Sequence, residues 1–142
     1  MSGSTMNYLH TPCDVELDSS SNVYIADSHN HRVVRWAMSS SSCTVVAGDG
    51  TAGSMNNQVS GPYDIAHDWN TNIFYVFDSF NNRILSYPSG VFTDTMVIGR
   101  SGTNNIQLLF HTGIYFDISS NSLYIANSSA NNIVRWVVGV SN

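Results

Sequence analysis

The chain has 142 residues and a formal charge of −5, and its five basic residues are all arginine. They form no basic stripe, so strong binding to a nucleic-acid backbone, which depends on neutralising phosphates, is not expected. No apolar run of about 18 residues is present, so we expect no transmembrane helix and no membrane partner. The first eleven residues lack both a basic and an apolar region, which argues against a signal peptide and leaves the compartment open.

Strand-like runs separated by polar turns follow one another along the chain. Gly, Asn, Asp and Ser stand between them, as expected for short antiparallel strands. No amphipathic helical pattern longer than two turns interrupts them, so the chain is predicted to be all-β. In chain order the predicted strands cover residues 13–18, 22–26, 32–37 and 43–47, then 63–68, 72–77, 83–87 and 94–98, then 112–118, 122–126 and 132–138.

A decamer recurs at the turn between the second and third strands of each group. It reads DSHNHRVVRW from residue 27, DSFNNRILSY from residue 78 and NSSANNIVRW from residue 127. The spacings of 51 and 49 residues lie in the range of propeller and solenoid repeats. The aromatic residue that ends each copy, Trp36, Tyr87 or Trp136, is predicted to pack between neighbouring repeats.

The second strand of each group is apolar at consecutive positions, which indicates burial on both faces. The middle of a propeller blade has this environment. We therefore predict a β-propeller segment of three blades of four-stranded antiparallel sheets, the last blade lacking its outer strand. The whole chain forms one such segment, with blade 1 at 12–47, blade 2 at 62–98 and blade 3 at 111–138.

The recurring turn carries charged residues for which we predict a structural role. Asp27 and Asp78 open the first two copies, where a short carboxylate accepts hydrogen bonds from backbone N–H groups two or three residues on. Asn127 can do the same in the third copy, and it also begins an N-glycosylation sequon. Arg32 and Arg83 begin the following strand and are expected to pair with a carboxylate of a neighbouring turn or blade.

These motifs resemble the NHL repeat, a β-propeller motif named for an Asn-His-Leu-type turn. Asn30 and His31 carry the name-giving pair, and the resemblance covers nearly the whole chain. The third copy is the weakest, because His111, Asn127 and Ala130 depart from the pattern. The second copy matches at Pro62, Ile65, Asp68, Asn72, Asp78, Asn81, Asn82 and Arg83.

The resemblance implies a six-bladed ring in many members, most often a protein-binding or RNA-binding platform and in a few an enzyme. Fold alone does not choose between these roles. The peptidylamidoglycolate lyase branch uses zinc held by histidines, with a His after the proline of the first strand of a blade. Cys13, Tyr63 and Thr112 stand at those positions here. The expected zinc ligands are therefore missing where the match would place them.

No residue pattern predicts a metal, a cofactor or a catalytic group. Cys13 and Cys43 form neither a disulfide framework nor a metal site, and no HExxH motif, P-loop or dinucleotide fingerprint occurs. His67 lies on the first strand of blade 2, where a side chain could face the central channel. It is the best single candidate for chemistry, although a purely structural histidine is the simpler interpretation.

Propeller topology places the turns between second and third strands on the same side as the loops that join the blades. These segments are rich in Ser, Asn, Gly and Thr and poor in charge, which suits adaptable hydrogen bonding. We predict a non-enzymatic face that binds a protein, with a metal-dependent enzyme of the lyase or hydrolase type as the alternative. The candidate residues are Ser28, His29, Asn30, His31, Asp49, Asn56, Asn57, Phe80, Asn81, Asn82, Arg100, Asn104, Asn105 and Asn131.

Three blades cannot close a ring by themselves, so the outer faces of blades 1 and 3 are expected to be exposed and apolar. Three arrangements are compatible with the sequence. The chain is part of a longer propeller, two copies associate into a six-bladed homodimer, or the three blades stand as an open arc.

Overall fold

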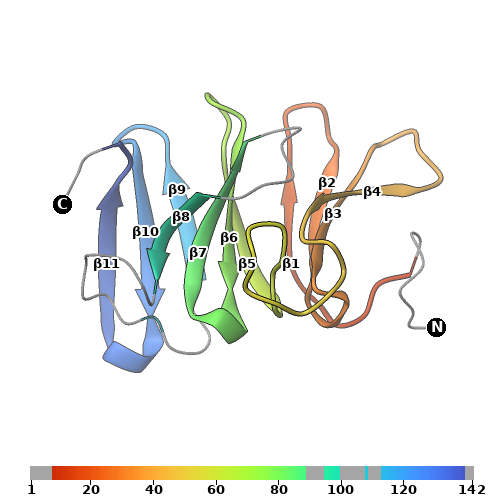
Figure 1. Ribbon diagram of the computed structural model, residues 1–142. Helices are drawn as coiled ribbons and strands as arrows, with labels where there is room; N and C mark the ends of the chain where they lie inside the picture. Colours follow the sequence, from red (N-terminus) through yellow and green to blue (C-terminus); the bar gives the residue numbers. More distant parts are fainter. Residues whose placement is uncertain (1–7, 89–94, 100–107, 109–112, 140–142) are drawn as a thin grey trace.

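The computed structural model describes residues 8–88, 95–99, 108 and 113–139. Three antiparallel sheets stand side by side in chain order (Figure 1). In each sheet the strands are hydrogen-bonded in the order of the sequence. The sheets contain β1 (Pro12–Leu17), β2 (Val23–Asp27), β3 (Arg32–Trp36) and β4 (Cys43–Ala47); β5 (Pro62–Asp68), β6 (Ile73–Asp78), β7 (Arg83–Pro88) and β8 (Thr95–Gly99); and β9 (Gly113–Asp117), β10 (Ser122–Asn127) and β11 (Asn132–Val137).

The predicted all-β fold class is confirmed. The predicted strands begin and end within one residue of the observed ones. Among the described residues the third sheet has three strands, as predicted from its missing fourth run. The alternation of polar turns with short apolar runs was therefore a sufficient signal for the strands.

A single turn of 3-10 helix joins the second and third strands of each sheet: η1 (Ser28–Asn30), η2 (Ser79–Asn81) and η3 (Ser128–Ala130). Each turn ends in a residue with left-handed backbone, namely His31, Asn82 or Asn131, with φ of 51°, 52° and 53°. Asn and His are enriched in this conformation among residues other than glycine. These three side chains are therefore placed by the geometry of the turn.

Two apolar cores fill the spaces between the sheets. Alternate residues of β6 supply both: Phe74 and Val76 face the first sheet, whereas Tyr75 and Phe77 face the third. Because successive side chains of a strand point to opposite faces, a strand between two sheets must be apolar at every position. This burial on both faces is what the consecutive apolar residues of the second strands predicted.

The aromatic residues at the ends of the decamers occupy different environments. Tyr87 is buried in the core between the first and second sheets, and Trp136 packs against the core between the second and third. Trp36 belongs to neither core; its indole N–H donates to the carbonyl of Ser40. Trp36 lies on the equivalent face of the first sheet, which points away from the second and is covered by no other described sheet, so its packing between repeats remains a prediction.

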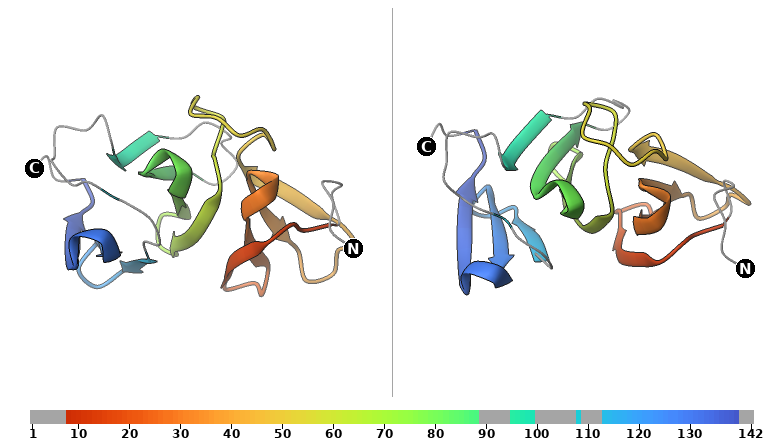
Figure 2. Two further views of the ribbon diagram at one scale, coloured as in Figure 1. Left: turned by 90° about the horizontal axis from the view of Figure 1, so that it is seen from below. Right: turned by 60° about the horizontal axis from the view of Figure 1, so that its bottom comes forward.

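Seen from below, the sheets fan out along an arc and the three 3-10 turns lie on one side of it (Figure 2). β5 lies beside both β1 and β9, so the first strands of the sheets are neighbours along one margin of the arc. In the described part of the chain, no helix is long and apolar enough to cross a membrane. Cys13 is exposed and Cys43 is buried, and neither forms a disulfide.

Candidate functional site

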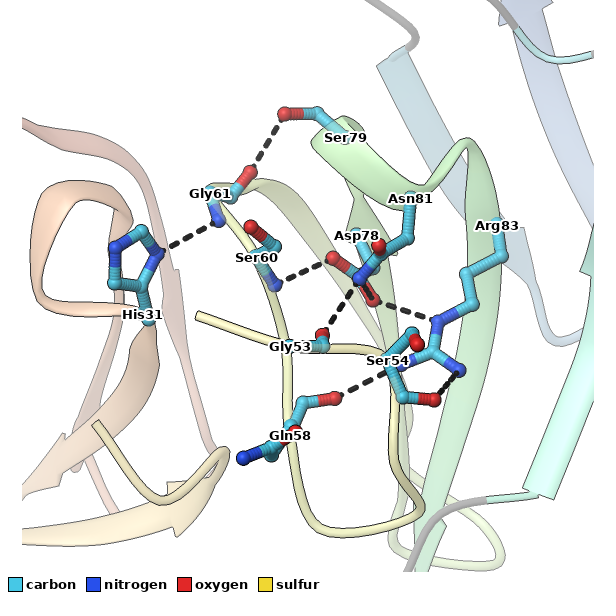
Figure 3. A network of polar contacts seen from close by, with 10 residues as sticks. All are labelled: His31, Gly53, Ser54, Gln58, Ser60, Gly61, Asp78, Ser79, Asn81 and Arg83. Atoms are coloured by element: carbon cyan, nitrogen blue, oxygen red, sulfur yellow. Dashed lines mark hydrogen bonds and ion pairs between the residues drawn. The ribbon is translucent and has the colours of Figure 1, made fainter. Parts of the chain in front are cut away.

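The second turn is organised around the buried carboxylate of Asp78, at the end of β6. It accepts hydrogen bonds from the backbone N–H of Ser60 at 2.6 Å, from the Asn81 amide at 2.9 Å and from Arg83 Nε at 2.7 Å (Figure 3). Arg83 also donates to the carbonyl of Gln58 at 2.9 Å. A buried charge is stable only with such partners. The Asp78 node, as we call these contacts, ties the turn to the loop that precedes β5.

The first turn repeats this arrangement about 50 residues earlier. Asp27 accepts hydrogen bonds from the backbone N–H of His10 at 2.7 Å, from the Asn30 amide at 2.8 Å and from Arg32 Nε at 2.8 Å. Arg32 also donates to the carbonyl of Tyr8 at 3.0 Å. The repeat therefore encodes a buried Asp–Asn–Arg set that holds the segment entering the first strand of its own sheet.

These contacts differ from the ones predicted. Neither aspartate caps its 3-10 turn through a side-chain hydrogen bond. Each accepts a backbone N–H from a segment 17 or 18 residues earlier in the chain, and each arginine pairs with the aspartate of its own turn rather than of a neighbouring one. Packing of the incoming segment over the turn causes the difference, because its N–H groups would otherwise be buried without a partner.

The third turn has lost these groups. Asn127, Ala130 and Asn132 replace the aspartate, asparagine and arginine, and the described residues hold no ion pair there. Asn127 is only 2% exposed. N-linked glycans are carried at the surface, so the folded chain offers no accessible acceptor at this sequon.

Internal hydrogen bonds fix the loop from Gly48 to Gly61. The Asp49 carboxylate accepts from the backbone N–H of Thr51 at 2.8 Å and from the Asn57 amide at 3.1 Å. At the other end, the N–H of Gly61 donates to Nδ1 of His31 at 3.1 Å (Figure 3). The loop is therefore anchored to the first turn as well as to the Asp78 node.

The structure divides the predicted face residues into four groups. Ser28 and Asn30 are buried, while His31, Asn81 and Asn82 are partly buried within the turns. Arg100, Asn104 and Asn105 lie outside the described residues. The exposed members of the face are His29, Asp49, Asn56, Asn57, Phe80 and Asn131.

Two exposed apolar side chains stand among these polar residues. Phe80, on η2, is 58% exposed, and Met55, in the 48–61 loop, is 68% exposed. The Phe80 ring lies against Gly61, where φ is +61° and an added Cβ would come within 2.9 Å of the ring. The prediction included Phe80 but missed Met55. A methionine within a run of Gly, Ser and Asn was the available signal, since nothing in such a loop would bury it.

Solved structures with similar folds were found although the sequence matches no protein-family model and no curated protein. A Bacteroides thetaiotaomicron protein of unknown function aligns with a TM-score of 0.73 at 18% identity, over 96% of this chain and 37% of its own. A chain of the nidogen/laminin complex aligns with a TM-score of 0.63 at 16% identity, over 87% of this chain and 47% of its own. Virginiamycin B lyase from Staphylococcus aureus aligns with a TM-score of 0.53 at 16% identity, over 92% of this chain and 42% of its own.

The chain is a partial β-propeller. It spans less than half the length of each of these proteins. At such low identity the likeness concerns the fold alone. Each sheet is accordingly a blade, numbered 1 to 3 along the chain, and β1, β5 and β9 are the inner strands.

His67 has the purely structural place that was its simpler interpretation and is buried rather than open to a channel. Its ring stacks on Phe74, with centroids 4.0 Å apart, and meets the edge of Trp69 at 3.9 Å. Nε2 lies 2.9 Å from the Asn72 side-chain oxygen, and burial lowers the pKa of the imidazole. The side chain is buried because β5 turns this face toward blade 1 rather than toward the channel. In the described ranges no three His, Cys, Asp or Glu side chains gather as metal ligands.

The inner strands of the propeller are linked by aspartates that sequence reasoning missed. Asp14 on β1 accepts the backbone N–H of Ile65 at 2.9 Å, and Asp64 on β5 accepts the backbone N–H of Ile114 at 2.6 Å. Each carboxylate thereby reaches from one blade to the next. Burial, followed by a hydrogen bond with Asp14, raises the pKa of Asp64 to about 7.

We expect this propeller to lose stability as the pH rises from about 4 to about 7. The pKa of Asp64 is about 7 in the folded state and near its ordinary value of 3.8 in the unfolded chain. The folded state therefore binds the proton more tightly, and the free energy of unfolding falls by about 1–3 kcal/mol across this window. Urea denaturation at a series of pH values measures the change.

Asp64→Asn is the control for this pH dependence, because asparagine keeps the shape of a neutral carboxyl. Glu16 and Asp78 also have raised pKa values, caused mainly by burial, and add to the trend, whereas the lowered pKa of His67 opposes it. The difference between the wild type and Asp64→Asn isolates the contribution of Asp64. Identical pH profiles for the two proteins would contradict the assignment.

Proposed function

We propose that this chain is part of an NHL-type propeller and that its turn face binds a protein partner without catalysing a reaction. The observation that carries the proposal is the pair of exposed apolar side chains, Met55 and Phe80, on a loop and a turn that the Asp78 node holds together. Isolated exposed apolar residues are ordinary on a protein surface. Here Met55 lies on a loop that the Asp78 node joins to the turn bearing Phe80, so both side chains are presented on preorganised backbone.

The anchoring of the loop supports this role for a physical reason. A flexible loop loses conformational entropy when it binds, and that loss weakens the complex. Here Arg83 donates to the carbonyls of Ser54 and Gln58, and Asn81 donates to the carbonyl of Gly53 (Figure 3). Residues on both sides of Met55 are thus fixed before a partner arrives.

The chemistry of the turn face favours a partner with apolar side chains and hydrogen-bonding groups. Asn56 on the loop and His29 on η1 are exposed hydrogen-bonding residues of the turn face, whereas Asn57 and Asp49 are bonded to each other within the loop. A polar rim around an apolar centre is typical of protein–protein interfaces. The packing of His67 supports a non-enzymatic role, because its imidazole is buried against the rings of Phe74 and Trp69.

Site-specific photo-crosslinking tests the proposal. A benzoylphenylalanine placed at Phe80 is expected to give one discrete adduct in extracts of cells that express the chain naturally. The same group at Trp69, an exposed aromatic residue at the opposite end of blade 2, is the matched control and is expected to give none. Met55→Asp should abolish the Phe80 adduct while leaving the circular dichroism spectrum unchanged.

Once the adduct is identified, binding can be measured directly. Phe80→Ala is expected to weaken the complex about tenfold, as for an anchor that contributes about 1.4 kcal/mol. An equal adduct at Trp69, or a Phe80→Ala variant that binds as tightly as the wild type, would refute the turn face as the binding surface.

A further inference from the structure

The two end blades each present an uncovered face. On blade 1 the register places Val15, Ile25 and Val34 on the face that points away from blade 2; Val15 is 60% exposed and Ile25 partly exposed, whereas Val34 is buried among neighbouring side chains. On blade 3 it places Ala126 and Ile133 on the face that points away from blade 2, and Ile133 is 73% exposed. Within the described ranges no other sheet covers either face.

The uncovered face of blade 3 repeats the face that blade 1 buries against blade 2. On blade 1 that buried face includes Tyr24, Ala26 and Val33, which lie in the first core. The equivalent residues of blade 3 keep the same character, with Tyr and Ala unchanged and isoleucine in place of valine. They are Tyr124, Ala126 and Ile133.

The uncovered face of blade 1 corresponds to the face of blade 2 that is packed against blade 1. On blade 2 this face is formed by Ile65, Val76, Leu85 and Tyr87 of the first core. At the equivalent register positions blade 1 also carries three aliphatic residues and one aromatic residue. They are Val15, Ile25, Val34 and Trp36.

We propose that blade 3 of one chain packs against blade 1 of a second copy, through the face-to-face contact that already joins blade 1 to blade 2. The two uncovered faces are the two halves of an interface that the chain forms internally. Such a contact is heterologous, so it generates a ring where the rotation closes. Two copies with two such contacts make a ring of six blades.

One feature of the internal interface is absent from the proposed contact. Between blades 1 and 2 the Asp14 carboxylate accepts the N–H of Ile65, and between blades 2 and 3 Asp64 accepts the N–H of Ile114. The equivalent position of blade 3 is Gly113, which has no side chain to accept the N–H of the second copy's Val15. The contact between copies therefore lacks one hydrogen bond and is weaker than the contacts within the chain.

Light scattering on a sizing column across a dilution series tests the proposal. We expect a dimer of twice 15.6 kDa that dissociates on dilution. Ile133→Asp, which places a charge on the blade 3 face, is expected to raise the dissociation constant at least tenfold, and Val15→Asp should do the same from the blade 1 face. Met38→Asp alters a more exposed apolar residue outside both faces and should have no effect.

Two further measurements depend on the heterologous geometry. Mixing Ile133→Asp with Val15→Asp chains should restore dimers, because each mixed pair keeps one unaltered contact. Gly113→Asp should lower the dissociation constant about fivefold by supplying the missing acceptor, whereas Gly113→Ala should not. A Cβ at Gly113 meets only ordinary contacts, at 3.6 Å to Asp64 and 3.9 Å to Ala126, so both variants can fold.

The outcomes separate this contact from other arrangements. A wild-type chain that is monomeric at every concentration overturns the proposal and indicates that further blades cover these faces. A dimer whose dissociation constant is unchanged by Ile133→Asp and by Gly113→Asp overturns it too, because the copies then associate through another surface. Neither outcome affects the turn face, which is tested by crosslinking at Phe80.

Discussion

Asp78→Ala is expected to lower the free energy of unfolding by about 3–5 kcal/mol, because it leaves the Arg83 guanidinium without its buried counter-ion. Asp78 is fully buried, and the substitution also removes the acceptor of the Ser60 N–H and of the Asn81 amide. Urea denaturation at pH 7, followed by circular dichroism at a fixed protein concentration, measures the loss.

Asn132→Ala is the matched control for this substitution. Asn132 is the first residue of β11, as Arg83 is the first residue of β7. Unlike Arg83, Asn132 is exposed and follows a turn that has no aspartate. We expect a change within about 0.5 kcal/mol. An Asp78→Ala variant as stable as Asn132→Ala would show that the node contributes little to the fold.

Phe77→Ala is expected to destabilise the chain by about 3–5 kcal/mol, the usual range for truncating a buried aromatic residue. Phe77 is fully buried in the core between blades 2 and 3, where it packs among residues such as Ile114 and Leu123. The cavity left by the ring lies where the two blades meet, so their packing should loosen. The same denaturation experiment measures the effect, with hydrogen exchange of the β10 amides as a local readout.

Met38→Ala serves as the control for Phe77→Ala, because Met38 is among the most exposed apolar residues of the described chain. We expect its effect to stay within about 0.5 kcal/mol. If Phe77→Ala costs no more than Met38→Ala, or if β10 keeps its protection, blades 2 and 3 are not held together by this core.

The fold places the proposed binding role and the proposed assembly on different parts of the molecule. The turn face lies at the ends of the strands, whereas the assembly contact uses the flat faces of blades 1 and 3. In a closed ring of two copies, the turns of all six blades would lie on one side. A partner would then meet two identical patches around Phe80, and two linked contacts bind more tightly than one where both can be reached together.

Sequence pattern alone predicted most of the fold. The turn residues located the strands within one residue, because Gly, Asn, Asp and Ser stop short apolar runs wherever they occur. The apolar second strands predicted burial on both faces, as β6 shows with Phe74 and Tyr75 in different cores. These signals are local, and each depends only on neighbours along the chain.

Predictions about individual side chains were less successful, because the partners of those side chains come from distant segments. The Asp78 carboxylate accepts the backbone N–H of Ser60, and the Asp14 carboxylate accepts that of Ile65 in the next blade, 51 residues away. His67 was only a candidate for a channel-facing side chain, and the structure stacks it on Phe74. No spacing in the sequence distinguishes an aspartate that caps its own turn from one that holds a separate loop.

The sequence by itself determined the repeat, the strands and the blades, because periodic burial leaves a periodic pattern of residue types. Only the tertiary structure decided which residues of the turn face remain free to bind. Asn56 is exposed on the 48–61 loop, whereas three other polar residues of the predicted face are used in the turns. Asn30 belongs to the Asp27 set, His31 accepts the N–H of Gly61 and Asn81 belongs to the Asp78 node. The physical reason is that buried polar groups must be paired, and the partner is set by how the chain packs in three dimensions.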